Sequence, residues 1–223
     1  MNFLAQRFQS SPALIILSMI LILFEFNAPT LYFLQFHQLF NAKAIFPFSF
    51  LVTYSLIFLF LLPFITSRYL SKQSLKGLGL TLPQNRKKVF ILIVFSLLLL
   101  IPVVFFSAHY QTVQTFYSLK GTPLYFIFFL VLAMPPYYFA EEFFFRGFLF
   151  LGLWKKLGWH SYWITEILFT WAHLGKPPIE LLLSFPAGMV LNYLTLKTQS
   201  IYPAMMVHFT MGILLTLLVT FFT

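Results

Sequence analysis

The ionisable residues of this apolar chain include a compact group of unlike charges. The stretch AEEFFFRG, residues 140–147, contains Glu141, Glu142 and Arg146. Only five of the 223 residues are acids and five are histidines, two of which follow in later apolar segments. A buried carboxylate beside imidazoles can take a proton from water and stabilise the negative charge that develops on an attacked amide. The group therefore predicts hydrolytic chemistry.

The spacing within this stretch separates its two carboxylates. Glu142 and Arg146 are four residues apart, so on a helix they share a face and can neutralise one another. Glu141 is rotated by about 100° from Glu142 and needs a different partner. The structural alternative is a buried salt bridge between helices, for which one Glu would be sufficient. Because ionisable side chains are costly in hydrocarbon, the group favours a functional site.

A second helix supplies the candidate partner of Glu141. Segments 140–156 and 160–175 predict an antiparallel helical hairpin whose turn has the sequence KKLGWH. Glu141 and His173 each lie 16 residues from Leu157, the midpoint of the turn, which corresponds to about 24 Å along a helix. We therefore expect the two side chains at the same depth. The alternative for a single histidine in an apolar helix is a satisfied core residue.

The same counting predicts two further features. Arg146 and Glu166 come to similar depths, and we expect a second ion pair between them. His208 follows Pro203, which suits the first turn of a helix. Since His208 lies about 10 Å from that helix start, it can join the other site residues only if the last helix is bent or inset.

One Glu and two His fit two kinds of hydrolase. In the first, Glu141 is the general base, and the histidines orient the water and stabilise the oxyanion. In the second, the same three residues bind zinc. The sequence contains no H-E-x-x-H segment, the usual helical arrangement of such ligands, so we rank zinc lower and expect neither a metal nor another cofactor.

The composition indicates that these residues lie in a membrane. Hydrophobic residues make up 60% of the chain, charged residues make up 9%, and the mean hydropathy is +0.88. We expect an all-α, polytopic transmembrane helical bundle that forms one integral membrane domain over residues 1–223. About seven apolar runs are long enough to cross a bilayer: 12–26, 46–66, 89–107, 123–140, 161–175, 178–196 and 202–222.

Membrane orientation explains the net charge of +9. Cytoplasmic loops carry an excess of Lys and Arg, and the loop 67–88 contains six such residues and no acid. Alternating the spans from this loop places ten cations on one side and three on the other, which predicts a cytoplasmic N-terminus. The lipid bilayer is the expected partner, and no nucleic acid is expected. Three residues unusual in a membrane helix interrupt the first span: Glu25, Asn27 and Pro29.

Three motifs in this order match a known pattern. They are E-E-x-x-x-R-G from Glu141, F-x-x-x-H from Phe169 to His173, and a histidine that follows S-I-x-P at Ser200. Over roughly residues 80–215, the chain resembles the family of CAAX prenyl proteases and bacteriocin-processing or self-immunity proteins, which are intramembrane glutamic endopeptidases.

The resemblance implies a role for each matching residue. Glu141 would activate the water, and Glu142 and Arg146 would support it. His173 would position the water, and His208 would stabilise the oxyanion.

One departure from the family pattern affects the oxyanion site. The family usually has Asn or Asp four residues after the last histidine, whereas this chain has Gly212. A donor is therefore missing there, and the candidate substitutes, Asn192 and Thr210, do not have the matching spacing. Ala187 and Gly188 resemble the small-residue stretch of the family, for which close helix packing is the alternative explanation.

These observations predict a peptidase that cleaves a peptide or protein substrate at a membrane anchor or in a C-terminal tail. Two alternatives remain: a non-catalytic scaffold or immunity protein of the same fold, and a proton-coupled transporter with Glu and His as relay groups. The sequence shows no repeated halves of the kind many transporters have. Cysteine is absent, which excludes a catalytic thiol. We expect the protein in a bacterial inner (plasma) membrane.

Overall fold

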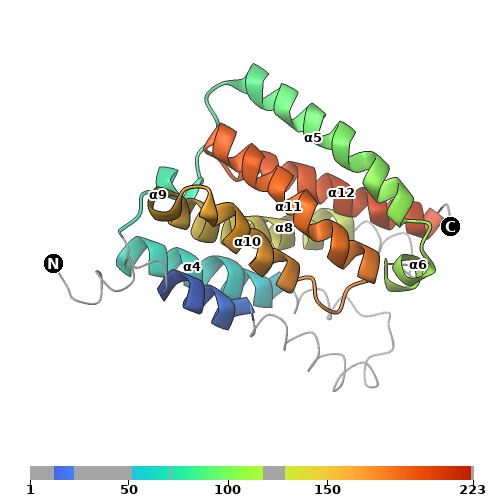
Figure 1. The fold of residues 1–223 in the computed structure, drawn as a ribbon, viewed down its shortest axis with the longest axis horizontal. Helices are drawn as coiled ribbons and strands as arrows, with labels where there is room; N and C mark the ends of the chain where they lie inside the picture. The colour runs from blue at the N-terminus through green and yellow to red at the C-terminus, as the bar shows by residue number, and fades with distance from the viewer. Residues whose placement is uncertain (1–12, 23–51, 71, 118–128, 222–223) are drawn as a thin grey trace.

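Helices form all the regular structure of the described residues. The computed structural model describes residues 13–22, 52–70, 72–117 and 129–221. Every regular element in these ranges is a helix, and the helices pack side by side as a bundle (Figure 1). The all-α prediction is therefore confirmed. The predicted interruption of the first span at Glu25, Asn27 and Pro29 lies outside the described residues, as do Arg7, Lys43 and Lys120.

Four of the described helices are long and apolar enough to cross a membrane. They are Val52–Tyr69, α5 (Arg86–Ser107), α11 (Pro178–Thr198) and α12 (Tyr202–Phe221). These helices make the protein an integral membrane protein, but the predicted number of seven spans is not confirmed. The helix Ala13–Ile22 is apolar but shorter.

Two predicted spans have a different form. The predicted span 161–175 overlaps α10 (His160–Trp171), whose 12 residues extend over only about 18 Å, less than the bilayer core of about 30 Å. The predicted span 123–140 continues directly into the first arm of the hairpin. Residues 129–157 form one helical run through four elements: η4 (Phe129–Ala133), α8 (Met134–Glu142), η5 (Phe143–Leu151) and α9 (Gly152–Leu157).

The sequence of α5 explains both its start and its exposure. The Asn85 side chain accepts a hydrogen bond of 2.9 Å from the backbone N–H of Lys88 and so caps the first turn. The helix spans about 33 Å, enough for the hydrocarbon core. Its large apolar side chains point outward, with Phe95 at 66% and Leu98 at 68% exposed. Such exposure would be unfavourable in water, so this face of the bundle lies against lipid.

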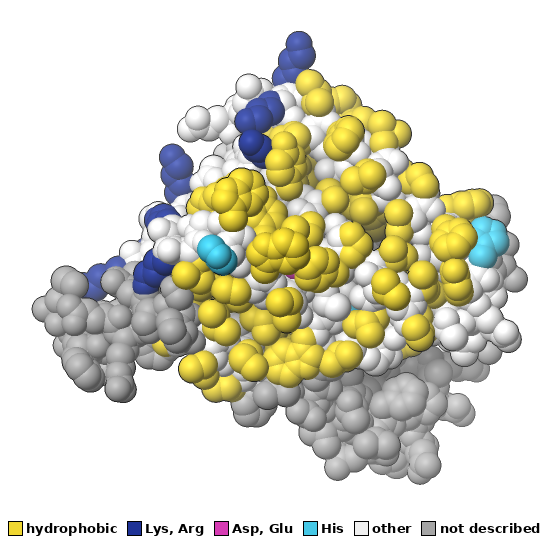
Figure 2. Space-filling model, viewed as in Figure 1, with side chains coloured by type: hydrophobic (Ala, Val, Ile, Leu, Met, Phe, Trp, Pro, Cys, Tyr) yellow, Lys and Arg dark blue, Asp and Glu magenta, His cyan; other side chains and the backbone are white. Residues whose placement is uncertain are grey.

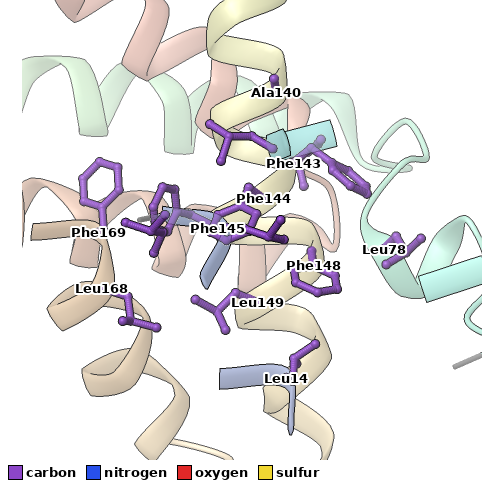
Figure 3. Close-up of a cluster of buried hydrophobic side chains, with 14 of the residues drawn as sticks. Leu14, Leu78, Ala140, Phe143, Phe144, Phe145, Phe148, Leu149, Leu168 and Phe169 are labelled. Carbon is purple, nitrogen blue, oxygen red and sulfur yellow. The ribbon is translucent and has the colours of Figure 1, made fainter. Parts of the chain in front are cut away.

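The π-helical element η5 is the innermost part of the bundle, and all nine of its residues are buried. An apolar helix that is enclosed on every side belongs in a core. The phenylalanines of η5 pack against Leu168 and Phe169 of α10, and Leu78 packs against η5 from another side (Figure 3). The hairpin prediction is confirmed, because α9 ends at Leu157 and Gly158 takes a positive φ of 51° before α10 begins.

A loop containing η3 (Lys76–Leu78) fixes one end of the bundle. A Cβ atom on Gly147 would lie 2.6 Å from the carbonyl oxygen of Leu78, so only glycine permits this close approach. The backbone N–H of Ile201, just before α12, donates a hydrogen bond of 3.0 Å to the carbonyl of Gly79. The loop is thereby held against both η5 and the start of α12.

Positive charge gathers at this same end. Figure 2 shows the Lys and Arg side chains along one edge of the molecule, over the start of α5 and the end of α9, while apolar side chains cover most of the remaining face. The Nζ atom of Lys155 lies 3.9 Å from the position of a Cβ on Gly77, which brings the loop of η3 close to the end of α9. The charge asymmetry read from the sequence is thus present in the fold.

Candidate active site

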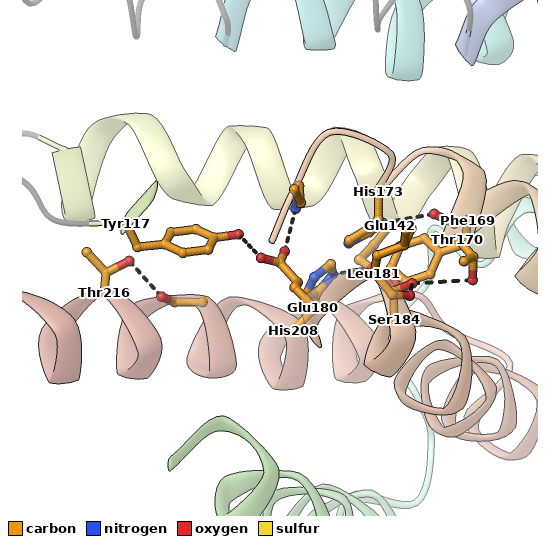
Figure 4. Close-up of polar contacts among 12 residues, drawn as sticks. Tyr117, Glu142, Phe169, Thr170, His173, Glu180, Leu181, Ser184, His208 and Thr216 are labelled. Carbon is orange, nitrogen blue, oxygen red and sulfur yellow. Dashed lines mark hydrogen bonds and ion pairs between the residues drawn. The ribbon is translucent and has the colours of Figure 1, made fainter. Parts of the chain in front are cut away.

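Glu142 and Arg146 form the ion pair that their spacing predicts. Oε2 of Glu142 lies 3.3 Å from Nε of Arg146, and both side chains are fully buried. The other carboxylate oxygen, Oε1, accepts a hydrogen bond of 2.7 Å from Nδ1 of His208 on α12 (Figure 4). The residues just before α12, Ser200 and Ile201, are themselves fully buried, which agrees with an inset start of this helix. Glu142 therefore connects the central run to α12.

The guanidinium of Arg146 is held by aromatic and backbone groups as well. Its Cζ atom lies 4.3 Å from the ring centroid of Phe169, within the range of a cation–π interaction. Nη2 donates to the carbonyl oxygen of Gly188 at 3.5 Å, a long hydrogen bond. Three elements, η5, α10 and α11, thus meet around one buried cation.

Glu141, His173 and His208 come together as the second polar group of the site. Their ligand atoms, one carboxylate oxygen and one ring nitrogen from each histidine, all lie within 4.8 Å of one another. Glu141 is 5% and His173 4% exposed, while His208 is partly exposed. Arg146 pairs with Glu142 and His173 lies with Glu141, as the 100° separation of the two acids on a helix predicts, whereas His208 lies next to both acids. The same three side chains also form a possible ligand set for a metal ion.

Hydrogen bonds determine which ring nitrogens face the site. Nδ1 of His173 is 2.8 Å from the carbonyl oxygen of Phe169. A carbonyl only accepts, so Nδ1 carries the proton and Nε2 presents a lone pair when the ring is neutral. Nδ1 of His208 likewise donates to the carboxylate of Glu142. In both rings, therefore, Nε2 is the nitrogen left for a reactant.

A cavity of about 130 Å³ adjoins this group of residues. His173 and His208 line it together with Tyr138 of α8, and most of the remaining wall is apolar, contributed by α5, α11 and α12. The volume is ample for several water molecules. A concave, mostly apolar pocket with a few convergent polar groups is the usual form of a small-molecule binding site.

A further polar cluster, which the sequence analysis did not identify, lines the same cavity. Nζ of Lys176 lies 2.9 Å from Oε1 of Glu180, and the hydroxyl of Tyr117 donates to Oε2 of Glu180 at 2.5 Å (Figure 4). Burial raises the pKa of Tyr117 well above its usual value, and the negative charge of Glu180 adds to this. Burial alone would lower the pKa of Lys176, but the carboxylate of Glu180 and the other acidic groups nearby together outweigh burial, and the pKa lies well above its usual value. The i,i+4 spacing of Lys176 and Glu180 was the sequence signal for this pair.

The predicted second ion pair between Arg146 and Glu166 is wrong. Glu166 accepts a hydrogen bond from the side-chain amide of Asn192, and Arg146 is paired with Glu142. Gly188 explains why this carboxylate fits: a Cβ there would lie 1.7 Å from Oε2 of Glu166. Arg146 and Glu166 come to similar depths on their helices, as predicted. The partner of Glu166 is nevertheless Asn192, because α11 turns this side chain towards it.

Asn192 and Thr210, the two candidate substitutes for the Asn or Asp that the family usually has at position 212, do not line the cavity. Asn192 is used by Glu166, as described above. The hydroxyl of Thr210 donates to the carbonyl of Met206 within α12, on an exposed face. Neither residue is among those that line the cavity.

Residues 120–214 match the family model described as type II CAAX prenyl endopeptidase Rce1-like. The match includes all five predicted site residues, so the family resemblance predicted from the motifs is confirmed over this region. It begins later than the predicted start near residue 80. No curated protein and no solved structure matches the chain significantly.

Proposed function

We propose that this chain, which matches the Rce1-like family over residues 120–214, is an intramembrane glutamic endopeptidase. Its substrate is a peptide or protein with a membrane anchor or a C-terminal tail that reaches the bilayer. The observation that carries the proposal is the grouping of Glu141, His173 and His208 within 4.8 Å beside an apolar cavity. The family match supports a membrane endopeptidase, and the arrangement of side chains supports this mechanism.

In this mechanism, Glu141 acts as the general base. It takes one proton from a water molecule, and the oxygen of that water forms a bond to the carbonyl carbon of the substrate. The carbonyl oxygen becomes an oxyanion. The proton on Glu141 then passes to the amide nitrogen, the carbon–nitrogen bond breaks, and an acid and an amine leave.

The two histidines act on different reacting groups: His173 on the attacking water and His208 on the oxyanion. Nε2 of His173 accepts a hydrogen bond from the attacking water, because its Nδ1 donates to Phe169. His208 in its protonated form donates from Nε2 to the oxyanion. The carboxylate of Glu142 accepts the hydrogen bond of 2.7 Å from Nδ1 and lies 3.3 Å from Nε of Arg146, which orients the ring of His208 towards the oxyanion.

The cavity and the surrounding bundle support a lipid-borne substrate. Apolar walls from α5, α11 and α12 suit an acyl or prenyl chain or an apolar peptide end better than a polar peptide. The gathered Lys and Arg residues at one end of the bundle support a cytoplasmic location for that end. The cytoplasmic N-terminus remains a prediction from the sequence. We place the protein in a bacterial inner membrane.

A zinc-dependent peptidase is the second candidate, because the same three side chains form a possible ligand set of the His₂Glu type. The bonds from Nδ1 of each histidine also resemble the outer contacts that orient metal ligands. Metal content decides between the two. The glutamic mechanism predicts full activity after chelation, whereas stoichiometric zinc that is lost in His173→Ala would establish the zinc enzyme.

The proposal is tested by incubating the purified protein in lipid vesicles with a panel of prenylated, acylated and transmembrane-anchored peptides. Mass spectrometry of the products identifies any cleaved bond. Wild-type protein is expected to cleave at least one class, and Glu141→Gln is expected to remain folded and inactive. Equal cleavage by both proteins would remove Glu141 from the mechanism. A chain that binds a substrate without cleaving it in any form would be the non-catalytic scaffold.

A further inference from the structure

The space next to Gly212 is already occupied by a tyrosine hydroxyl. A Cβ atom built on Gly212 would lie 1.7 Å from Oη of Tyr138 and 2.6 Å from its Cζ. Any side chain at position 212 would therefore have to displace the end of this ring. Gly212 is four residues after His208, on the same face of α12, so the hydroxyl lies where a side chain one turn beyond His208 would be.

Tyr138 also belongs to the geometry of the proposed site. It precedes Glu141 by three residues and Glu142 by four on α8, which places all three on one side of this helix. Its ring meets that of His208 edge to face, with the centroids 4.7 Å apart. Tyr138, His173, His208 and Gly212 line the same cavity.

The hydroxyl of Tyr138 is available to a ligand. No hydrogen bond joins this hydroxyl to another described residue. This contrasts with Tyr117 on the same cavity wall, whose hydroxyl is used by Glu180. A buried or partly buried tyrosine hydroxyl normally has a partner. The neighbouring group in the proposed mechanism that requires a donor is the oxyanion of the attacked amide.

We propose that Tyr138 is a catalytic residue whose hydroxyl donates a hydrogen bond to the oxyanion beside His208. This inference rests on the proposed peptidase function. No proton is transferred in this role: the O–H bond of Tyr138 stays intact, and the hydrogen bond strengthens as negative charge develops on the carbonyl oxygen. Gly212 contributes by leaving the space in which the hydroxyl lies.

The variant Tyr138→Phe separates this role from simple packing, since it keeps the ring and its contact with His208 but removes the hydroxyl. Loss of one oxyanion donor lowers kcat by about 10²- to 10³-fold, and KM is expected to change little, because the bond forms mainly in the transition state. A ring that only fills space would leave kcat unchanged in Tyr138→Phe.

A rescue pair tests the position of the hydroxyl. Gly212→Asn in the wild-type background is expected to lose activity, because its side chain collides with Tyr138. In Tyr138→Ala the collision is removed, so adding Gly212→Asn supplies a new donor one turn after His208. The double variant is expected to have a kcat at least tenfold above that of Tyr138→Ala alone. If the kcat of the double variant does not exceed that of Tyr138→Ala, the Tyr138 hydroxyl does not act at the oxyanion, and the proposal is overturned.

The outcomes distinguish the two levels of inference. Cleavage by the wild type that is lost in Glu141→Gln but unchanged in Tyr138→Phe overturns the role of Tyr138 and leaves the peptidase intact. No cleavage of any peptide by the wild type, with bound substrate recovered whole, overturns both. Thermal unfolding of each variant, measured in the same vesicles, identifies any loss of folded protein and corrects kcat for it.

Discussion

Two regions of the same bundle contain buried carboxylates in quite different surroundings. Glu142 contacts Arg146 and His208, and the neighbouring Glu141 lies with two histidines at the edge of a cavity. Glu166 lies between α10 and α11, where its partner is the amide of Asn192.

The difference between these regions lies in the space next to each acid. At Glu166, the carboxylate itself occupies the space that a side chain at position 188 would need, and Glu166 does not line the cavity. In the other region, His173 and His208, which lie with Glu141, line a cavity of about 130 Å³. The proposed role of Glu141 as a base, and not of Glu166, therefore rests on the space that the packing leaves beside the two histidines.

The largest effect is expected from comparing the same substitution in the two regions. Glu141→Gln removes the proposed base and should lower kcat by about 10²- to 10⁴-fold. Glu166→Gln should leave kcat within a few-fold of wild type, because the Gln oxygen can still accept from Asn192. Cleavage rates in vesicles at saturating substrate measure both. A large loss in Glu166→Gln would break the contrast between the regions.

The two regions should also differ in how strongly they depend on their partners. Arg146→Ala leaves the fully buried carboxylate of Glu142 without its cation, which is expected to cost about 3–5 kcal/mol of stability. Asn192→Ala removes a neutral partner of Glu166 and is expected to cost about 1–3 kcal/mol. Unfolding in mixed micelles with increasing denaturant gives both values. Equal losses of stability in the two variants would mean that the buried ion pair contributes no more than the neutral hydrogen bond.

Filling the space at Gly188 provides the next test. Gly188→Ala places a methyl group against the Glu166 carboxylate and should destabilise the protein by about 1–3 kcal/mol. Gly152→Ala is the matched control, because a Cβ at Gly152 would meet only the ends of two flexible side chains, Leu14 at 3.1 Å and Gln73 at 3.7 Å. If the two melting temperatures fall equally, the packing explanation for Gly188 is wrong.

The smallest effect on stability is expected at the polar cluster of Lys176, Glu180 and Tyr117. Lys176 keeps 26% of its side chain exposed, so Lys176→Met should cost only about 0.2–1 kcal/mol at neutral pH. The pKa of Lys176 is raised in the folded state. Its contribution is therefore fully present below the usual lysine pKa and is lost as the pH rises through the folded value.

Thermal unfolding at neutral and strongly alkaline pH measures this dependence, with exposed Lys156→Met as the control. The difference between wild type and Lys176→Met should shrink at the alkaline pH. A difference that stays constant would assign the stabilisation to packing of the lysine stem.

Local spacing in the sequence was enough to predict several features correctly. The i,i+4 relation of Glu142 and Arg146, the turn at Gly158 and the equal depth of Glu141 and His173 all follow from the regular geometry of helices. Membrane character and the all-α fold follow from composition, because only helices or closed barrels satisfy backbone groups in lipid. These properties depend on neighbours along the chain.

The tertiary structure decided which helices face one another and where space remains between them. Depth alone paired Arg146 with Glu166, but the rotation of α11 supplied Asn192 instead. The cavity and the position of Tyr138 against Gly212 depend on side chains that are far apart in sequence. Such contacts arise from close packing of the whole bundle, in which a change in side-chain volume of about one methylene group is felt. No short-range sequence pattern encodes them.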